Sequence, residues 1–79
     1  MTKVQTIKAP MQAVVHAINV AAGDSVSVGQ ELVILEAMKM HYEIIAEVDG
    51  TVEEVTAVAG NQVAADDVLI EINQQQEAN

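Results

Sequence analysis

Lys39 lies in the run Glu36-Ala37-Met38-Lys39-Met40, the segment of this chain best suited to chemistry. Lys39 is the only lysine or arginine after residue 8, in a chain that carries 12 acidic residues. A lysine amine can accept an acyl group, and thioether side chains on both sides offer flexible, polarizable contacts. The pattern indicates an amine that is presented to another molecule.

An amine must be neutral to attack an acyl group, and only about one lysine in a thousand is neutral near pH 7. Glu36 favours the cation, and the neighbouring residues supply no base. We therefore expect a separate enzyme to activate the acyl group and to deprotonate Lys39. On this interpretation Met38 and Met40 are contacts for that enzyme, and Ala37 leaves room for its approach. The segment is a substrate, and we predict no catalytic residue and no metal ligand.

The composition limits the classes of function that fit. The 79 residues make one small domain with a net charge of −9, which opposes binding to nucleic acid or to an anionic membrane surface. There is no cysteine and no apolar stretch of transmembrane length, so we expect a cytoplasmic protein. The hydrophobic fraction is 51%, but Tyr42 is the only aromatic residue, so the core is expected to consist of aliphatic side chains.

An internal repeat organises the chain. A shift of 37 residues places Gly23 on Gly60, and the residues that follow each glycine also correspond. Each half reads as a strand, a glycine turn, a short apolar pair and a second strand. The longer strands are expected at residues 4–7, 13–18, 31–36, 41–46, 51–58 and 68–72. Because no segment has a helical period, the sequence predicts an all-β sandwich or flattened barrel of two quasi-symmetric halves.

The midpoint of residues 7–72 falls between Lys39 and Met40. Two related units joined there predict a hairpin with Lys39 at its tip and both chain termini at the opposite end. The two central residues of such a turn need positive φ, so Met38 and Lys39 are expected to carry strain. We assign residues 1–73 to the domain and residues 74–79 to a polar, disordered tail.

Three segments together resemble the biotinyl/lipoyl attachment family over residues 7–72. They are the Ala-Met-Lys-Met run, the opening Ala9-Pro10-Met11, and the paired turns Gly23-Asp24 and Gly60-Asn61. The resemblance implies a flattened eight-stranded β-barrel of two quasi-symmetric sheets. It also implies that Lys39 carries biotin through an amide bond.

In that family the Met-Lys-Met sequence marks biotin, whereas lipoyl domains usually carry Asp-Lys followed by a small residue. The resemblance assigns Lys39 as the attachment residue and Met38 and Met40, with Ala37 and Glu36, as the flanks that a ligase recognises. It implies a non-catalytic biotin carboxyl carrier, as a subunit or domain. Its expected partners are a biotin protein ligase, a biotin carboxylase and a carboxyltransferase.

The chain also departs from the family pattern. Gln12-Ala13 stands where the family often has Pro-Gly, in a loop that is expected to lie near the hairpin. Ile18 reaches Gly23 without the insertion that marks the bacterial acetyl-CoA carboxylase carrier. This favours an acyl-CoA, pyruvate or decarboxylase system.

Several alternatives remain open. One alternative is that Lys39 accepts lipoate instead of biotin. Another is that the barrel is an unmodified structural or interaction module. His16 and His41 are expected to be strand residues rather than acid–base groups. Surface acids, which either form a solvated face or steer docking, include Glu53, Glu54, Asp66 and Asp67.

Overall fold

The computed structural model describes residues 2–75 and contains eight β-strands. The strands are β1 (Thr2–Lys8), β2 (Ala13–Ile18), β3 (Ser25–Val26), β4 (Glu31–Ala37), β5 (Met40–Ile45), β6 (Gly50–Val55), β7 (Gln62–Val63) and β8 (Val68–Gln75). Across these residues the chain forms no helix, and so none long and apolar enough to cross a membrane.

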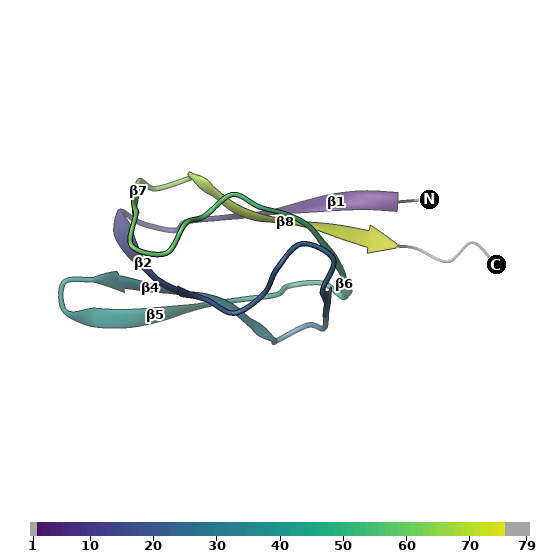
Figure 1. Cartoon of the computed structure of the whole chain (residues 1–79), viewed down its shortest axis with the longest axis horizontal. Helices are drawn as coiled ribbons and strands as arrows, with labels where there is room; N and C mark the ends of the chain where they lie inside the picture. Colours follow the sequence, from purple (N-terminus) through teal and green to yellow (C-terminus); the bar gives the residue numbers. More distant parts are fainter. Residues whose placement is uncertain (1, 76–79) are drawn as a thin grey trace.

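The strands form two four-stranded antiparallel sheets, in the orders β1-β8-β6-β3 and β5-β4-β2-β7. The sheets lie over one another as the two layers of a flattened barrel (Figure 1). The two halves of the chain correspond strand by strand, β1 to β5, β2 to β6, β3 to β7 and β4 to β8. Exchanging each strand for its counterpart converts one sheet order into the other. The predicted all-β fold of two quasi-symmetric halves is therefore confirmed.

The repeat extends to the register of the strands. Val15 of β2 pairs with Leu35 of β4, and Val52 of β6 pairs with Ile72 of β8. These two pairs are related by the same shift of 37 residues that aligns the glycine turns. An irregularity follows Val15 in one ladder and Val52 in the other. The two halves therefore share the register of strand pairing as well as the order of strands.

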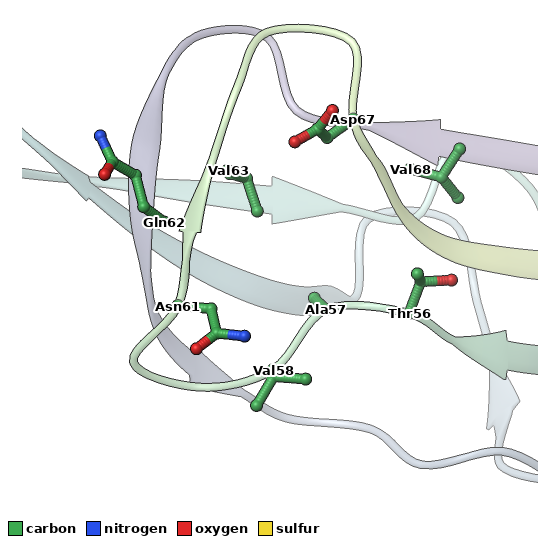
Figure 2. Close-up of a pocket in the computed structure, with 8 residues that line it drawn as sticks. All are labelled: Thr56, Ala57, Val58, Asn61, Gln62, Val63, Asp67 and Val68. Atoms are coloured by element: carbon green, nitrogen blue, oxygen red, sulfur yellow. The ribbon is translucent and has the colours of Figure 1, made fainter.

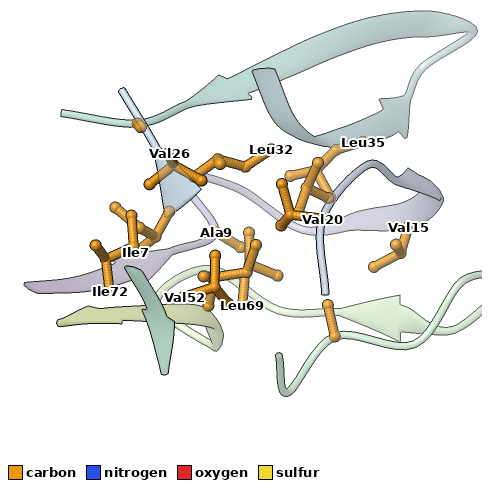
Figure 3. Packing of buried hydrophobic residues seen from close by; sticks show 14 of the residues in the cluster. Ile7, Ala9, Val15, Val20, Val26, Leu32, Leu35, Val52, Leu69 and Ile72 are labelled. Carbon is orange, nitrogen blue, oxygen red and sulfur yellow. The ribbon is translucent and has the colours of Figure 1, made fainter. Parts of the chain in front are cut away.

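An aliphatic core fills the space between the sheets (Figure 3). In β2 alternate side chains point to opposite faces, so Val15 is buried while Val14 and His16 are exposed. The buried hydrophobic residues are Ile7, Ala9, Ala13, Val15, Val20, Val26, Leu32, Val33, Leu35, Ala46, Val52, Ala57, Leu69, Ile70 and Ile72. Tyr42 packs against this cluster only in part, as expected for a core without aromatic residues.

The β4–β5 turn lies at one end of the barrel, and β1 begins and β8 ends at the other (Figure 1). Thr2 and Lys3 pair with Gln75 and Gln74, which holds the start of β1 against the end of β8. The central hairpin and the ends of the described chain, Thr2 and Gln75, are thus at opposite ends of the barrel, as predicted.

Two predicted boundaries differ from the structure. The strand expected over residues 51–58 ends at Val55, because the N–H groups of Thr56 and Ala57 both donate to the carbonyl of Leu69 and the chain leaves the ladder. Strand β8 continues to Gln75 through its pairing with β1, so the boundary placed after residue 73 falls within a strand. The rest of the predicted tail, residues 76–79, lies outside the described residues.

Gly29 provides a test of backbone strain in this fold. Its φ is +88°, and a Cβ added there would meet no atom within 4 Å. Substitution Gly29→Ala is therefore expected to lower the free energy of unfolding by about 1 kcal/mol through strain alone. Gly29→Asn should lose less than half as much, because asparagine tolerates the left-handed region. Urea denaturation of both variants checks this, and equal losses would contradict it.

Candidate functional site

The β4–β5 turn consists of two residues, Met38 and Lys39, between the paired Ala37 and Met40. Met38 has φ 52° and Lys39 has φ 64°. Two positive values are the requirement of a type I′ hairpin turn, in which asparagine and glycine are preferred. The expected strain is present, at a cost of about 1–2 kcal/mol for each residue. The continuous β4–β5 ladder, which pairs Glu36 with His41 and Leu35 with Tyr42, holds this turn in place.

The turn projects its side chains into solvent. Lys39 is exposed, and the exposed fractions of Met38 and Met40 are 92% and 58%. The Tyr42 hydroxyl donates a hydrogen bond to the sulfur of Met40 at 3.8 Å. Met40 is therefore held on the side of β5, whereas Met38 stands out from the tip. An amine between two exposed apolar side chains is open to an enzyme that approaches from the end of the barrel.

Glu36 is directed to His41 rather than to Lys39. The distance from His41 Nε2 to Glu36 Oε2 is 3.4 Å, across the strand pair that leads into the turn. Within residues 2–75 no ion pair involves Lys39. The expected effect of Glu36 on the lysine is thus not seen as a direct contact, and Glu36 instead joins β4 to β5 beneath the turn.

The structure brings together two histidines, His16 and His41, from strands that are not consecutive in the sequence. The ring centroids of His16 and His41 are 4.6 Å apart with an interplanar angle of 33°. Both are exposed strand residues, as expected. Their proximity follows from the order β5-β4-β2, which the alternation of apolar residues did not determine. Among the residues that the structure describes, no three or more histidine, cysteine, aspartate or glutamate side chains are arranged to hold a metal ion.

An open depression lies directly beside the turn, on the outer side of the sheet that carries it. Its volume is about 280 Å³. It is lined by Gln12, Ala13, Val14, Glu36, Ala37, Met38 and Gln62. Gln12 and Ala13 were expected to lie near the hairpin, and they line this depression together with Met38 of the turn.

A second depression, of about 330 Å³, lies where β6 leads into β7 and β8 (Figure 2). Asp67 is its only ionisable lining residue, and one of its carboxylate oxygens accepts the N–H of Ala64 at 2.8 Å. The side chain that could do chemistry there is therefore occupied in closing the β7–β8 turn. The candidate site remains at the β4–β5 turn.

The four surface acids are all exposed, and three of them have local structural roles. Asp67 closes the β7–β8 turn. The Glu53 carboxylate accepts a hydrogen bond from the side-chain amide of Asn73 at 3.1 Å. Asp66 has φ 72° and occupies the position that corresponds to Gly29 in the first half. Glu54 pairs with Glu71, a like-charged neighbour. A role in docking stays a prediction.

Fold and site together define a carrier type of domain: a rigid barrel with one exposed lysine at the tip of a two-residue turn. The model of the family described as "Biotin-requiring enzyme" matches residues 5–72. The chain belongs to this biotinyl/lipoyl attachment family, as the motif predicts. The match also supports biotin as the cofactor.

Curated relatives differ in how much of their length the chain covers. The chain is 46% identical over 67 residues to the biotin carboxyl carrier protein of Streptococcus mutans, covering 85% of this chain and 52% of that protein. It is 42% identical over 66 residues to the human mitochondrial propionyl-CoA carboxylase alpha chain, covering 84% of this chain and 9% of that one. It is 40% identical to the biotin/lipoyl attachment protein of Bacillus subtilis, covering 86% of this chain and 93% of that protein.

Solved structures show the same fold. A single-chain, multi-domain long-chain acyl-CoA carboxylase matches with a TM-score of 0.85 and 25% identity, over 91% of this chain and 7% of that one. The lipoyl domain of the 2-oxoglutarate dehydrogenase complex from Azotobacter vinelandii matches with a TM-score of 0.75 and 26% identity, over 85% and 92% of the two chains. The barrel alone therefore does not distinguish biotin from lipoate, and the residues of the turn must do so.

Proposed function

We propose that Lys39 Nζ is the attachment point of biotin and that this chain is the carrier part of a biotin-dependent carboxylase. The observation that carries the proposal is the placement of the intact Ala37-Met38-Lys39-Met40 run. Its lysine occupies a strained two-residue turn at the end of the barrel opposite the start of β1 and the end of β8. Strain of this kind persists where the surrounding structure fixes it, and it often marks functional positions.

Attachment is an acyl transfer in which this chain is the nucleophile. The neutral amine of Lys39 attacks the carboxyl carbon of biotin activated as an acyl-adenylate, the new C–N bond forms, and the C–O bond to AMP breaks. The proton that the amine loses passes to a base of the ligase, because the described residues place no base at Lys39. Exposed Met38 and Met40 offer that ligase apolar contacts without fixed hydrogen bonds.

The protein's contribution after attachment is presentation rather than catalysis. When bound, biotin supplies the capacity to hold a carboxyl group for transfer. We propose as partners a biotin protein ligase, a biotin carboxylase and a carboxyltransferase, in an acyl-CoA-type system. The rigid β4–β5 ladder keeps Lys39 at the end of the barrel, and tethering raises the effective concentration of the group at each partner site. A cytoplasmic location forms part of this proposal.

Intact-mass analysis tests this function. The protein is produced in cells with active biotin and lipoate ligases and with both cofactors supplied. We expect the wild-type chain to gain the mass of one biotinyl group. Lys39→Arg should gain none, because arginine keeps the positive charge but does not present an acylatable amine.

The remaining lysines, Lys3 and Lys8, serve as internal controls, since they lie on β1. A lipoyl-sized increase would move the chain to the alternative carrier class. No increase, with both ligases active on a control substrate, would favour an unmodified barrel and overturn the proposal.

A further inference from the structure

The depression beside the turn has a floor built from three strands. Gln62 of β7 pairs with Val14 of β2, and Val14 pairs with Glu36 of β4, so these side chains form one row across the sheet. Gln12 and Met38 complete the walls. Val14 is 39% exposed, which leaves an apolar surface in the middle of the row. Polar groups therefore flank an apolar centre.

We propose that this depression is a resting site for the bicyclic head of the biotin that Lys39 carries. The inference rests on the proposed attachment at Lys39. It adds a binding surface on the carrier itself, formed by Gln12, Val14, Glu36 and Gln62, to which the tethered group returns between transfers.

The chemistry of the lining complements that head. The ureido ring has two N–H donors and one carbonyl acceptor. Glu36 Oε2 faces His41, so the other carboxylate oxygen is the acceptor offered to the ring, and the amides of Gln12 and Gln62 can also donate hydrogen bonds. Val14 and the methionine stem of Met38 offer apolar contact to the sulfur-containing ring and the alkyl chain. A mixed surface of this kind, apolar with a few convergent polar groups, is typical of small-ligand sites.

The tether has the reach to place the head there. The lysine side chain and the pentanoyl chain of biotin together span about eleven single bonds of roughly 1.5 Å each. Met38, which lines the depression, is the chain neighbour of Lys39. The arm can therefore fold back over Met38 onto the row Glu36–Val14–Gln62 without any movement of the barrel.

Weak binding is sufficient for this role. The depression is open and, at about 280 Å³, small. A short tether gives an effective concentration on the order of 1 mM, so a site with a Kd of about 1 mM is half occupied. A site of that strength holds the head part of the time and releases it readily to a partner enzyme.

Nuclear magnetic resonance on the biotinylated protein tests the proposal. The chain is labelled with ¹³C and ¹⁵N and then modified by purified ligase with unlabelled biotin, and intact mass establishes complete modification. We expect isotope-filtered NOEs from the biotin ring protons to the methyl groups of Val14 and Ala37. We also expect shifts of the Gln12 and Gln62 side-chain amides relative to the unmodified protein.

The double variant Gln12→Ala/Gln62→Ala alters two exposed residues and should lose these NOEs while remaining fully biotinylated. Gln5→Ala, which truncates a half-buried glutamine on β1 of the other sheet, is the control and should keep them. Complete biotinylation with shifts confined to residues 37–40 would overturn the resting site and leave the proposed function intact. Failure of biotinylation would overturn both, and the mass measurement separates the two results.

Discussion

Exchanging the two turn residues in the variant M38K/K39M is expected to lower the rate of biotinylation by at least about 100-fold, the scale of loss that small misplacements of a reacting group produce. Composition, charge and length stay the same. Met38 and Lys39 occupy the first and second central positions of the turn, with φ 52° and 64°. The exchange therefore moves the amine from position 39, between Met38 and Met40, to position 38.

Initial rates with purified ligase, ATP and biotin, followed by intact mass, measure this effect. Met38→Leu is the control, because it keeps Lys39 in place and substitutes an apolar side chain of similar size. Urea denaturation should give the same midpoint for the exchanged and wild-type chains. An exchanged variant that is modified at the wild-type rate would show that the position of the lysine in the turn is unimportant.

Truncating Leu35 is expected to cause a large loss of stability, about 3–5 kcal/mol for Leu35→Ala. Leu35 is 0% exposed and lies on β4, two residues before Ala37 at the turn. Truncation of the Leu35 side chain leaves a cavity in a core that consists of Val, Leu, Ile and Ala side chains. Small domains start from only about 5–15 kcal/mol, so this variant should be close to unfolding.

Ile45→Ala is the matched control, because it removes a side chain of similar size that is 46% exposed. It should lower the free energy of unfolding by less than about 1 kcal/mol. Urea denaturation of both variants gives the comparison. Similar losses from the two substitutions would contradict the assignment of the core to the space between the sheets.

The sequence was informative wherever the repeat and the strand alternation specified the backbone. The shift that places Gly23 on Gly60 predicts two equivalent halves, and the strand orders of the two sheets obey it. Because Lys39 lies at the midpoint of residues 7–72, the repeat predicts that it is at a hairpin tip, and the positive φ values of Met38 and Lys39 agree. These features are local or follow from symmetry, so one chain is enough to predict them.

Contacts between strands that are distant in the sequence could not be predicted in the same way. The His16–His41 pair and the row from Gln62 through Val14 to Glu36 depend on the order β5-β4-β2-β7. Alternation assigns each side chain to a face but not to a neighbour. The extension of β8 to Gln75 likewise arises from its pairing with β1, which overrides the weak strand propensity of Asn73.

Peptide mapping of the protein produced in biotin-supplied cells tests the central claim most directly. Cleavage after glutamate releases residues 37–43, in which Lys39 is the only lysine, and keeps Lys3 and Lys8 on a separate N-terminal peptide. We predict that fragmentation will place one biotinyl group on Lys39 and none on the N-terminal peptide. A biotinyl group on Lys3 or Lys8, or an unmodified 37–43 peptide in cells whose ligase is active, would contradict the assignment of the β4–β5 turn as the attachment site.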